Sequence, residues 1–96
     1  MPRRAEAVLV LPSELTHAQA RASLQMLQQG LRAVSGPAVV VDASGLQVFD
    51  STALAVLLEV RRDALSGGRS FAVQGLTRRL ADLAALYGVD ELLPAC

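Results

Sequence analysis

The centre of the chain carries its clearest pattern of hydrophobic and polar positions. Residues 39–41 are three consecutive valines, a run typical of a strand that is covered on both faces. The small and polar residues 42–45 predict that this strand ends at Asp42 or Ala43. Residues 46–49 then form a second, shorter extended stretch.

A helix is predicted directly after this stretch. Gly67 and Gly68 stand where the helix is expected to end with a residue in the left-handed backbone conformation. Asp50 or Ser51 is the predicted N-cap, because an oxygen of either side chain accepts a bond from a backbone N–H that has no helical partner. The apolar positions that recur at helical spacing are Ala53, Leu54, Leu57, Leu58 and Leu65.

The N-terminal part predicts one strand and one helix. Residues 7–11 are apolar and short enough for a strand. A helix is expected over residues 17–34, with Ser13 or Thr16 as its N-cap. Gly30 weakens the interior of this helix by about 1 kcal/mol relative to alanine. Its presence indicates a close approach of the helix to the sheet.

The C-terminal part predicts another strand and helix. Residues 69–74 alternate, with Phe71 and Val73 on one face, which is typical of a strand near a sheet edge. Thr77 is expected to cap a helix that ends at Gly88 and is followed by one last helical turn. The residues expected to face inward are Leu80, Leu83, Ala84 and Tyr87. Strands that alternate with helices imply mainly parallel pairing in an α/β sandwich.

Composition removes several classes of function. The 96 residues are one domain, 1–96, and with 52% hydrophobic but only 3% aromatic residues the core must consist of Leu, Val and Ala. All nine basic residues are arginine, so neither a P-loop lysine nor a Schiff-base lysine is available. A net charge of zero gives no general attraction to nucleic acid.

The sequence also favours a cytoplasmic location. The longest apolar run, residues 53–58, is far shorter than the roughly 18–20 residues that a membrane span needs. No basic segment followed by an apolar stretch marks a signal peptide. The single Cys96 has no internal disulfide partner.

Two blocks resemble a known family. Residues 42–62, DASGLQVFDSTALAVLLEVRR, resemble the signature of STAS domains (sulfate transporter and anti-sigma factor antagonist). The signature loop corresponds to Asp42, Ser44 and Gly45, and Ala53 replaces the glycine usual at the start of the helix. Residues 71–94, FAVQGLTRRLADLAALYGVDELLP, resemble the C-terminal part of MlaB-type STAS proteins, the small subunits of Mla phospholipid ABC transporters.

The resemblance implies a fold and a function. The fold is a STAS sandwich with a mixed, mainly parallel sheet of about four strands and helices packed largely on one side. The family usually has a further strand before the one at Ala7, for which only six residues are left. The implied function is that of a protein that binds the cytoplasmic ATPase of an Mla-type transporter and regulates or stabilises it. That transporter maintains the lipid asymmetry of the outer membrane. This function is non-enzymatic and needs no cofactor or metal. Such a protein joins the inner membrane only through that complex.

The resemblance also implies where a partner binds. Ser51 takes the family's phosphorylatable position, and Thr52 takes the second hydroxyl position. An alternative function is therefore that of an anti-sigma factor antagonist switched by phosphorylation of Ser51. The exposed side of the helix is expected to offer small and apolar residues near its start and charges further along. The predicted partner-binding residues are Asp50, Ser51, Thr52, Ala55, Val56, Glu59 and Arg62, with Asp63 as the alternative to Arg62.

Other chemistry has simpler explanations. Asp42 and Asp50 could form an acid–base or metal pair. The simpler interpretation is that Asp42 accepts bonds from backbone amides of the turn and that Asp50 caps the helix. His17 with Ser51 and an aspartate could form a hydrolase triad, but no Gly-x-Ser-x-Gly elbow is present. The arginine pairs are solvated helix faces or, for the first pair, contacts to acidic residues of a partner. They are Arg61, Arg62, Arg78 and Arg79.

Overall fold

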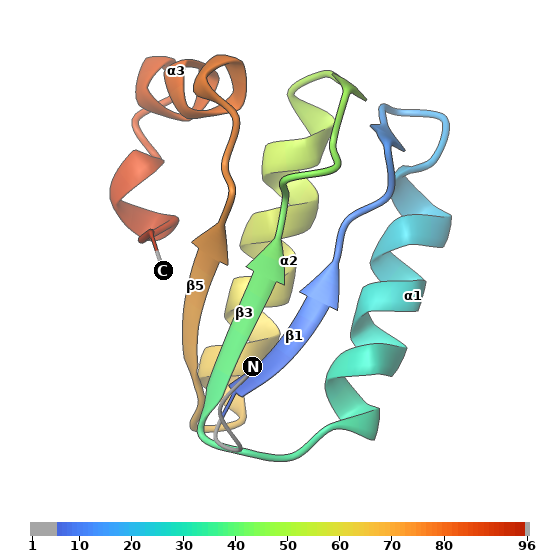
Figure 1. Ribbon diagram of the computed structural model, residues 1–96, viewed down its shortest axis with the longest axis vertical. Coiled ribbons are helices and arrows are strands. Elements are labelled where there is room, and N and C mark those ends of the chain that lie inside the picture. Colours follow the sequence, from blue (N-terminus) through green and yellow to red (C-terminus); the bar gives the residue numbers. More distant parts are fainter. Residues whose placement is uncertain (1–5, 96) are drawn as a thin grey trace.

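The structure is a computed structural model that describes residues 6–95 (Figure 1). Its elements are β1 (Glu6–Val10), β2 (Glu14–Leu15), α1 (Ala20–Ala33), β3 (Ala38–Asp42), β4 (Val48–Phe49), α2 (Thr52–Ser66), β5 (Ser70–Gln74), α3 (Arg78–Leu86) and the 3-10 turn η1 (Asp90–Leu92). The predicted α/β architecture is confirmed. The further strand that the family usually has before Ala7 would fall in residues 1–5, outside the described residues.

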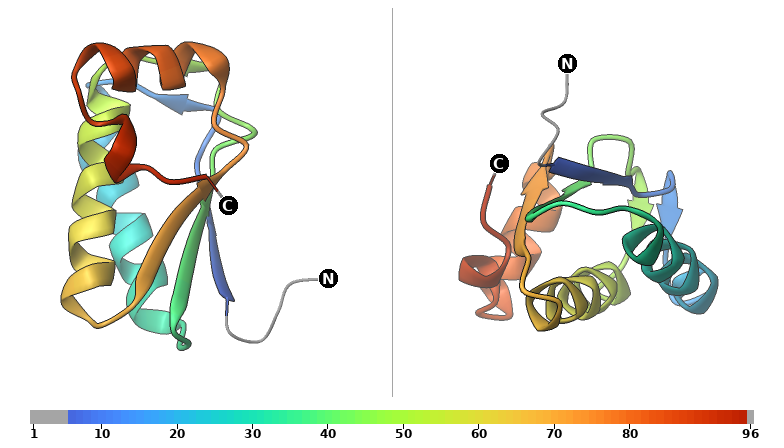
Figure 2. Two further views of the ribbon diagram at one scale, coloured as in Figure 1. Left: turned by 90° about the vertical axis from the view of Figure 1, so that its left-hand side faces the viewer. Right: turned by 90° about the horizontal axis from the view of Figure 1, so that it is seen from below.

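The described strands form two parallel sheets. β3 lies between β1 and β5, with Val40 opposite both Val8 and Ala72. β2 and β4 form a separate parallel pair, so the expected sheet of about four strands is a sheet of three with a pair beside it. α1 and α2 cover one face of the larger sheet, and α3 lies across the end toward which the strands point (Figures 1 and 2).

The core lies between this sheet and the helices. Val39, Val41 and Val73 are fully buried, and so are Leu57 and Val60 on the facing side of α2. A Cβ on Gly30 would lie 2.9 Å from Leu9 Cδ2, which confirms the close approach predicted between this helix and the sheet.

The β5 edge is partly covered by the end of the described chain. β5 is an outer strand, as its alternating pattern predicts. The backbone N–H of Val73 donates to the carbonyl of Pro94 at 2.8 Å, and Ala95 forms an isolated parallel bridge to Val73. The last residues therefore supply bonds that an edge strand would otherwise leave to solvent.

Three sequence predictions need correction. α1 begins at Ala20, because a separate turn takes the preceding residues: the Gln19 side-chain carbonyl accepts bonds from the backbone N–H and hydroxyl of Thr16. Neither Ser13 nor Thr16 therefore caps α1. Leu65 is 45% exposed. The last buried residue of α2 is Ala64, and the side chain that follows it on the helix points away from that buried stripe.

Tyr87 is also misplaced by the sequence prediction. It is 59% exposed, whereas the helical spacing assigned it to the core. α3 ends at Leu86, so Tyr87 occupies the C-cap and Gly88, with φ +72°, turns the chain away. The helical period no longer sets the direction of a side chain at that point.

Candidate protein-binding surface

Asp50 organises the start of α2. Its Oδ1 accepts a bond from the backbone N–H of Thr52 at 2.8 Å, and its Oδ2 accepts one from the backbone N–H of His17 at 3.2 Å. Ser51 has helical torsion angles and makes no side-chain capping bond. Asp50 is therefore the residue that caps the helix, and it also ties α2 to the turn before α1.

Ser51 and Thr52 differ in accessibility. Ser51 is exposed, and Thr52 is half-buried behind it. Because Asp50 accepts the N–H of Thr52, the capping bond does not occupy the Ser51 hydroxyl. The start of α2 therefore presents one accessible hydroxyl on a turn that is held in place on both sides.

The signature loop follows β3 at the same end of the sheet. Asp42 Oδ1 accepts a bond from the backbone N–H of Ser44 at 2.9 Å, while Ser44 and Gly45 are exposed. Gly75, after β5, has φ +68° and lies so close that a Cβ there would be 2.7 Å from the Cβ of Ser44. The loop is thus braced by its own aspartate and by the turn after β5.

Both aspartates are held in their charged form. Hydrogen bonding by Ser44, through its side chain first and its backbone second, lowers the pKa of Asp42 below 3.8. The Thr52 side chain and backbone do the same for the pKa of Asp50, with a smaller contribution from His17. These carboxylates therefore serve as turn and cap acceptors, as the simpler sequence interpretation has it.

Along α2, the exposed side differs in part from the prediction. Ala55 and Arg62 are exposed and Glu59 is half-buried, but Val56 is only 3% exposed and packs in the core. The prediction that Val56 lies on the surface is wrong. Val56 is three positions after Ala53 and four before Val60, so it lies on the buried stripe of the helix.

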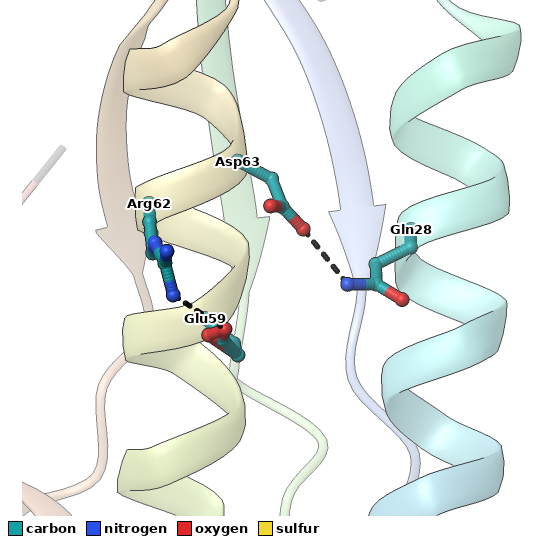
Figure 3. A network of polar contacts seen from close by, with 4 residues as sticks. All are labelled: Gln28, Glu59, Arg62 and Asp63. Atoms are coloured by element: carbon teal, nitrogen blue, oxygen red, sulfur yellow. Dashed lines mark hydrogen bonds and ion pairs between the residues drawn. The ribbon is translucent and has the colours of Figure 1, made fainter.

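The charged residues further along α2 have local partners (Figure 3). Arg62 pairs with Glu59 at 3.5 Å across one turn of the exposed side. Asp63 points instead toward α1, where its Oδ2 accepts a bond from Gln28 Nε2 at 2.8 Å. Of the two predicted possibilities, Arg62 is thus the residue on the exposed side.

The remaining candidate residues have separate positions. His17 meets Asp50 through its backbone, and within residues 6–95 no hydrogen bond joins its ring to Ser51. Arg79 is exposed, as predicted, and its guanidinium also lies 5.1 Å from the centre of the Phe49 ring, which makes a cation–π contact. Arg61 is half-buried and Arg78 is exposed.

Among residues 6–95, no group of three or more His, Cys, Asp or Glu side chains is placed to hold a metal ion. The helices of this same part of the chain are each too short or too polar to cross a bilayer.

Comparison with known proteins identifies the family. A family model described as "Mlab, STAS domain" matches residues 2–94. The chain belongs to the MlaB-type STAS family. A search of curated proteins finds no match to this chain.

Solved structures share this STAS fold. A sulfate transporter family protein from Wolinella succinogenes is 16% identical, with a TM-score of 0.73 over 93% of this chain and 71% of its own. A variant of Moorella thermoacetica RsbS is 23% identical, with a TM-score of 0.75 over 100% of this chain and 82% of its own. A chain of the stressosome, described as a signal integration and transduction hub, is 24% identical, with a TM-score of 0.70 over 99% and 83%. At these identities the likeness establishes the fold alone.

Membership in the STAS family changes how this surface is interpreted. STAS domains are generally non-catalytic regulatory domains that mediate contacts between proteins. In this STAS domain, the start of α2 and the loop after β3 lie at the end toward which the strands of the sheet point (Figure 1). Ser51, the residue just before α2, is exposed. Such a braced end offers a surface for contact with another protein.

Sequence reasoning missed part of this surface of the STAS domain. Leu86, 79% exposed, and Tyr87 end α3 next to two hollows, one of which Ser51 lines. The only sequence signal was the glycine after Tyr87, which marks the helix end and so releases Tyr87 from the helical period.

The stability of this STAS domain is expected to fall as the pH drops below about 4. In the folded chain the pKa of Asp42 and that of Asp50 lie below 3.8. The stability that the two charged aspartates add is therefore fully present above their unfolded-state pKa. It is lost as the pH falls through their lower, folded-state pKa. Urea unfolding midpoints measured from neutral pH down to about pH 2 would show this loss.

The matched variant for this titration is Asp50→Asn. Asparagine is also a good N-cap and can still accept the N–H of Thr52, but it does not titrate. The variant is expected to lose less stability than the wild type over the same pH range. An equally steep loss in both proteins would show that Asp50 contributes nothing to the acid sensitivity.

Proposed function

We propose that this chain is a non-enzymatic STAS subunit that binds the cytoplasmic ATPase of an Mla-type phospholipid ABC transporter. Residues 1–96 would act as one domain that regulates or stabilises the ATPase, and so supports the lipid asymmetry of the outer membrane. The observation that carries the proposal is the exposed start of α2 at Ser51, which the hydrogen bonds of Asp50 hold in place. Family membership over residues 2–94 supports the choice of partner.

The mechanism needs only differential binding. A rigid surface loses little conformational entropy when a partner docks on it. If the STAS subunit binds one conformation of the ATPase more tightly than another, it shifts the ATPase toward that conformation by the difference in binding free energy. No bond has to be made or broken on the STAS subunit, which joins the inner membrane only through the complex.

The test is a charge placed at Ser51. Ser51→Asp is expected to weaken binding to the Mla-type ATPase of the same genome by about tenfold or more, because a carboxylate that loses water in an interface without a partner is costly. Ser51→Ala, which adds no charge and removes no capping bond, is the control and should bind within a few-fold of wild type. Co-purification and titration calorimetry measure both.

Ser51→Asp with undiminished affinity would count against the start of α2 as the contact surface. A wild-type chain that binds no ATPase would overturn the assignment of the partner. Circular dichroism melts of both variants establish that they are folded before binding is compared.

A second candidate function is that of an anti-sigma factor antagonist switched by phosphorylation of Ser51. It is favoured by the exposure of Ser51, whose hydroxyl is not used in capping. A phosphate there would add a charge of roughly −1.5 to −2 beside Asp50, favoured by the helix N-terminus and opposed by the carboxylate. Mass spectrometry of the native protein that finds no phosphate on Ser51 across growth conditions would overturn this alternative.

A further inference from the structure

A hollow of 230 Å³ lies beside Ser51, between the first turns of α2 and the end of α3. Leu54 is buried, Leu58 and Val89 are half-buried, and the remaining lining residues are exposed. The residues that line it are Ser51, Leu54, Ala55, Leu58, Tyr87 and Val89. None of these side chains is charged, and the two polar groups are the hydroxyls of Ser51 and Tyr87.

Large side chains are exposed at the end of α3, beside this hollow. Tyr87 is 59% exposed, and its neighbour Leu86, which lines the next hollow along with Phe49 and Arg79, is 79% exposed. Large apolar side chains that project beside a concave apolar surface are typical of a site where another protein packs. Tyrosine is among the residues most enriched at such sites.

We propose that this hollow receives one apolar side chain of the ATPase, of leucine to phenylalanine size, as an anchor of the complex. This inference rests on the proposed function and specifies how the partner binds. Its first support is continuity, because Ser51 belongs both to the lining of the hollow and to the docking surface already argued.

Size and polarity select this occupant. At 230 Å³ the hollow is smaller than the roughly 300–1,000 Å³ of small-molecule sites. A charged side chain would exchange water for apolar walls, one of them the ring of Tyr87, and two hydroxyls, and these contacts do not offset the loss of hydration. An aliphatic or aromatic side chain loses nothing of this kind and removes the apolar walls from water.

The anchor also explains why the position of Ser51 matters for binding. A neutral hydroxyl at the edge of an apolar hollow costs little when the anchor enters. A carboxylate in place of this hydroxyl, or a phosphate attached to it, would stand against the anchor and lose its own hydration. The effect of a charge at Ser51 is thereby a consequence of what fills the hollow beside it.

The test fills the hollow from within the chain. Ala55→Trp is expected to weaken binding of the purified chain to the Mla-type ATPase by about tenfold or more, because the indole occupies the place of the anchor. The matched control is Ala22→Trp, the same change at an exposed position of α1 that does not line the hollow, with affinity unchanged. Titration calorimetry gives both values.

A second pair of variants tests the wall without adding bulk. Tyr87→Ala is expected to lower the affinity by a similar factor, while Tyr87→Phe keeps the ring and should bind nearly as the wild type does. Because Tyr87 is exposed at the end of α3, both proteins should fold, which leaves a test if Ala55→Trp does not.

The outcomes separate this inference from the proposed function. Binding by the wild type that neither Ala55→Trp nor Tyr87→Ala weakens would overturn the anchor while the partner assignment stands. A wild type that binds no ATPase overturns both. If sedimentation shows instead that the chain dimerises and that Ala55→Trp abolishes the dimer, the occupant is a second copy and the inference is wrong.

Discussion

Leu57→Ala is expected to lower the free energy of unfolding by about 2–5 kcal/mol. Leu57 is 0% exposed in the middle of α2, where it belongs to the core between sheet and helices. The change removes apolar contacts and leaves a cavity that the surrounding core can fill only in part. A chain of this length has only about 5–14 kcal/mol of total stability, so the variant loses a large share of it.

The control for Leu57→Ala is the same substitution at Leu86. Leu86 is 79% exposed on α3, so its replacement should change the free energy of unfolding by less than about 0.5 kcal/mol. Urea unfolding followed by circular dichroism measures both variants against the wild type. Equal destabilisation of the two proteins would mean that α2 does not pack on the sheet as described.

The position of α2 connects this core to the proposed docking surface. Its buried stripe, which includes Leu57 and Val60, fixes the rotation of the helix. That rotation places Asp63 against α1 and Arg62 on the exposed side (Figure 3). Ala55 is exposed as well. The residues that α2 exposes are therefore determined by residues that lie in the core.

Most of the regular elements follow from the sequence because their patterns are long. The run of valines at residues 39–41 favoured a strand covered on both faces, and β3 is the middle strand of the sheet. The alternation after residue 69 correctly indicated an edge strand. β2 escaped prediction because two residues have no period, and it is a strand only through its pairing with β4. The division into a sheet of three strands and a separate pair was not predicted either, because the strands of the pair are equally short.

The site was harder to predict than the fold, for reasons that are local. Asp50 and Ser51 are equally good caps by residue type, and only the bonds to Thr52 and His17 distinguish them. Val56 was predicted on the surface but is buried, and Tyr87 was predicted in the core but is exposed. A shift of one position round a helix, or one residue past its end, reverses burial without changing the apolar pattern.

Gly75→Ala is expected to destabilise the chain and to displace the signature loop. Gly75 has φ +68°, where a residue with a Cβ costs about 1–3 kcal/mol. The new methyl group would also lie 2.7 Å from the Cβ of Ser44 and 3.0 Å from its Cα, so backbone must move at a further cost of about 1–3 kcal/mol. A more restricted unfolded chain offsets about 0.4–1 kcal/mol of this.

Gly88→Ala separates the two contributions to this loss. Gly88 has φ +72°, but a Cβ there would meet nothing within 4 Å, so the variant measures the backbone cost alone. The free energy of unfolding should therefore fall further for Gly75→Ala than for Gly88→Ala, and only the former should shift the NMR signals of Ser44 and Gly45. Equal losses with an undisturbed loop would show that the turn after β5 does not brace the signature loop, which would then owe its shape to Asp42 alone.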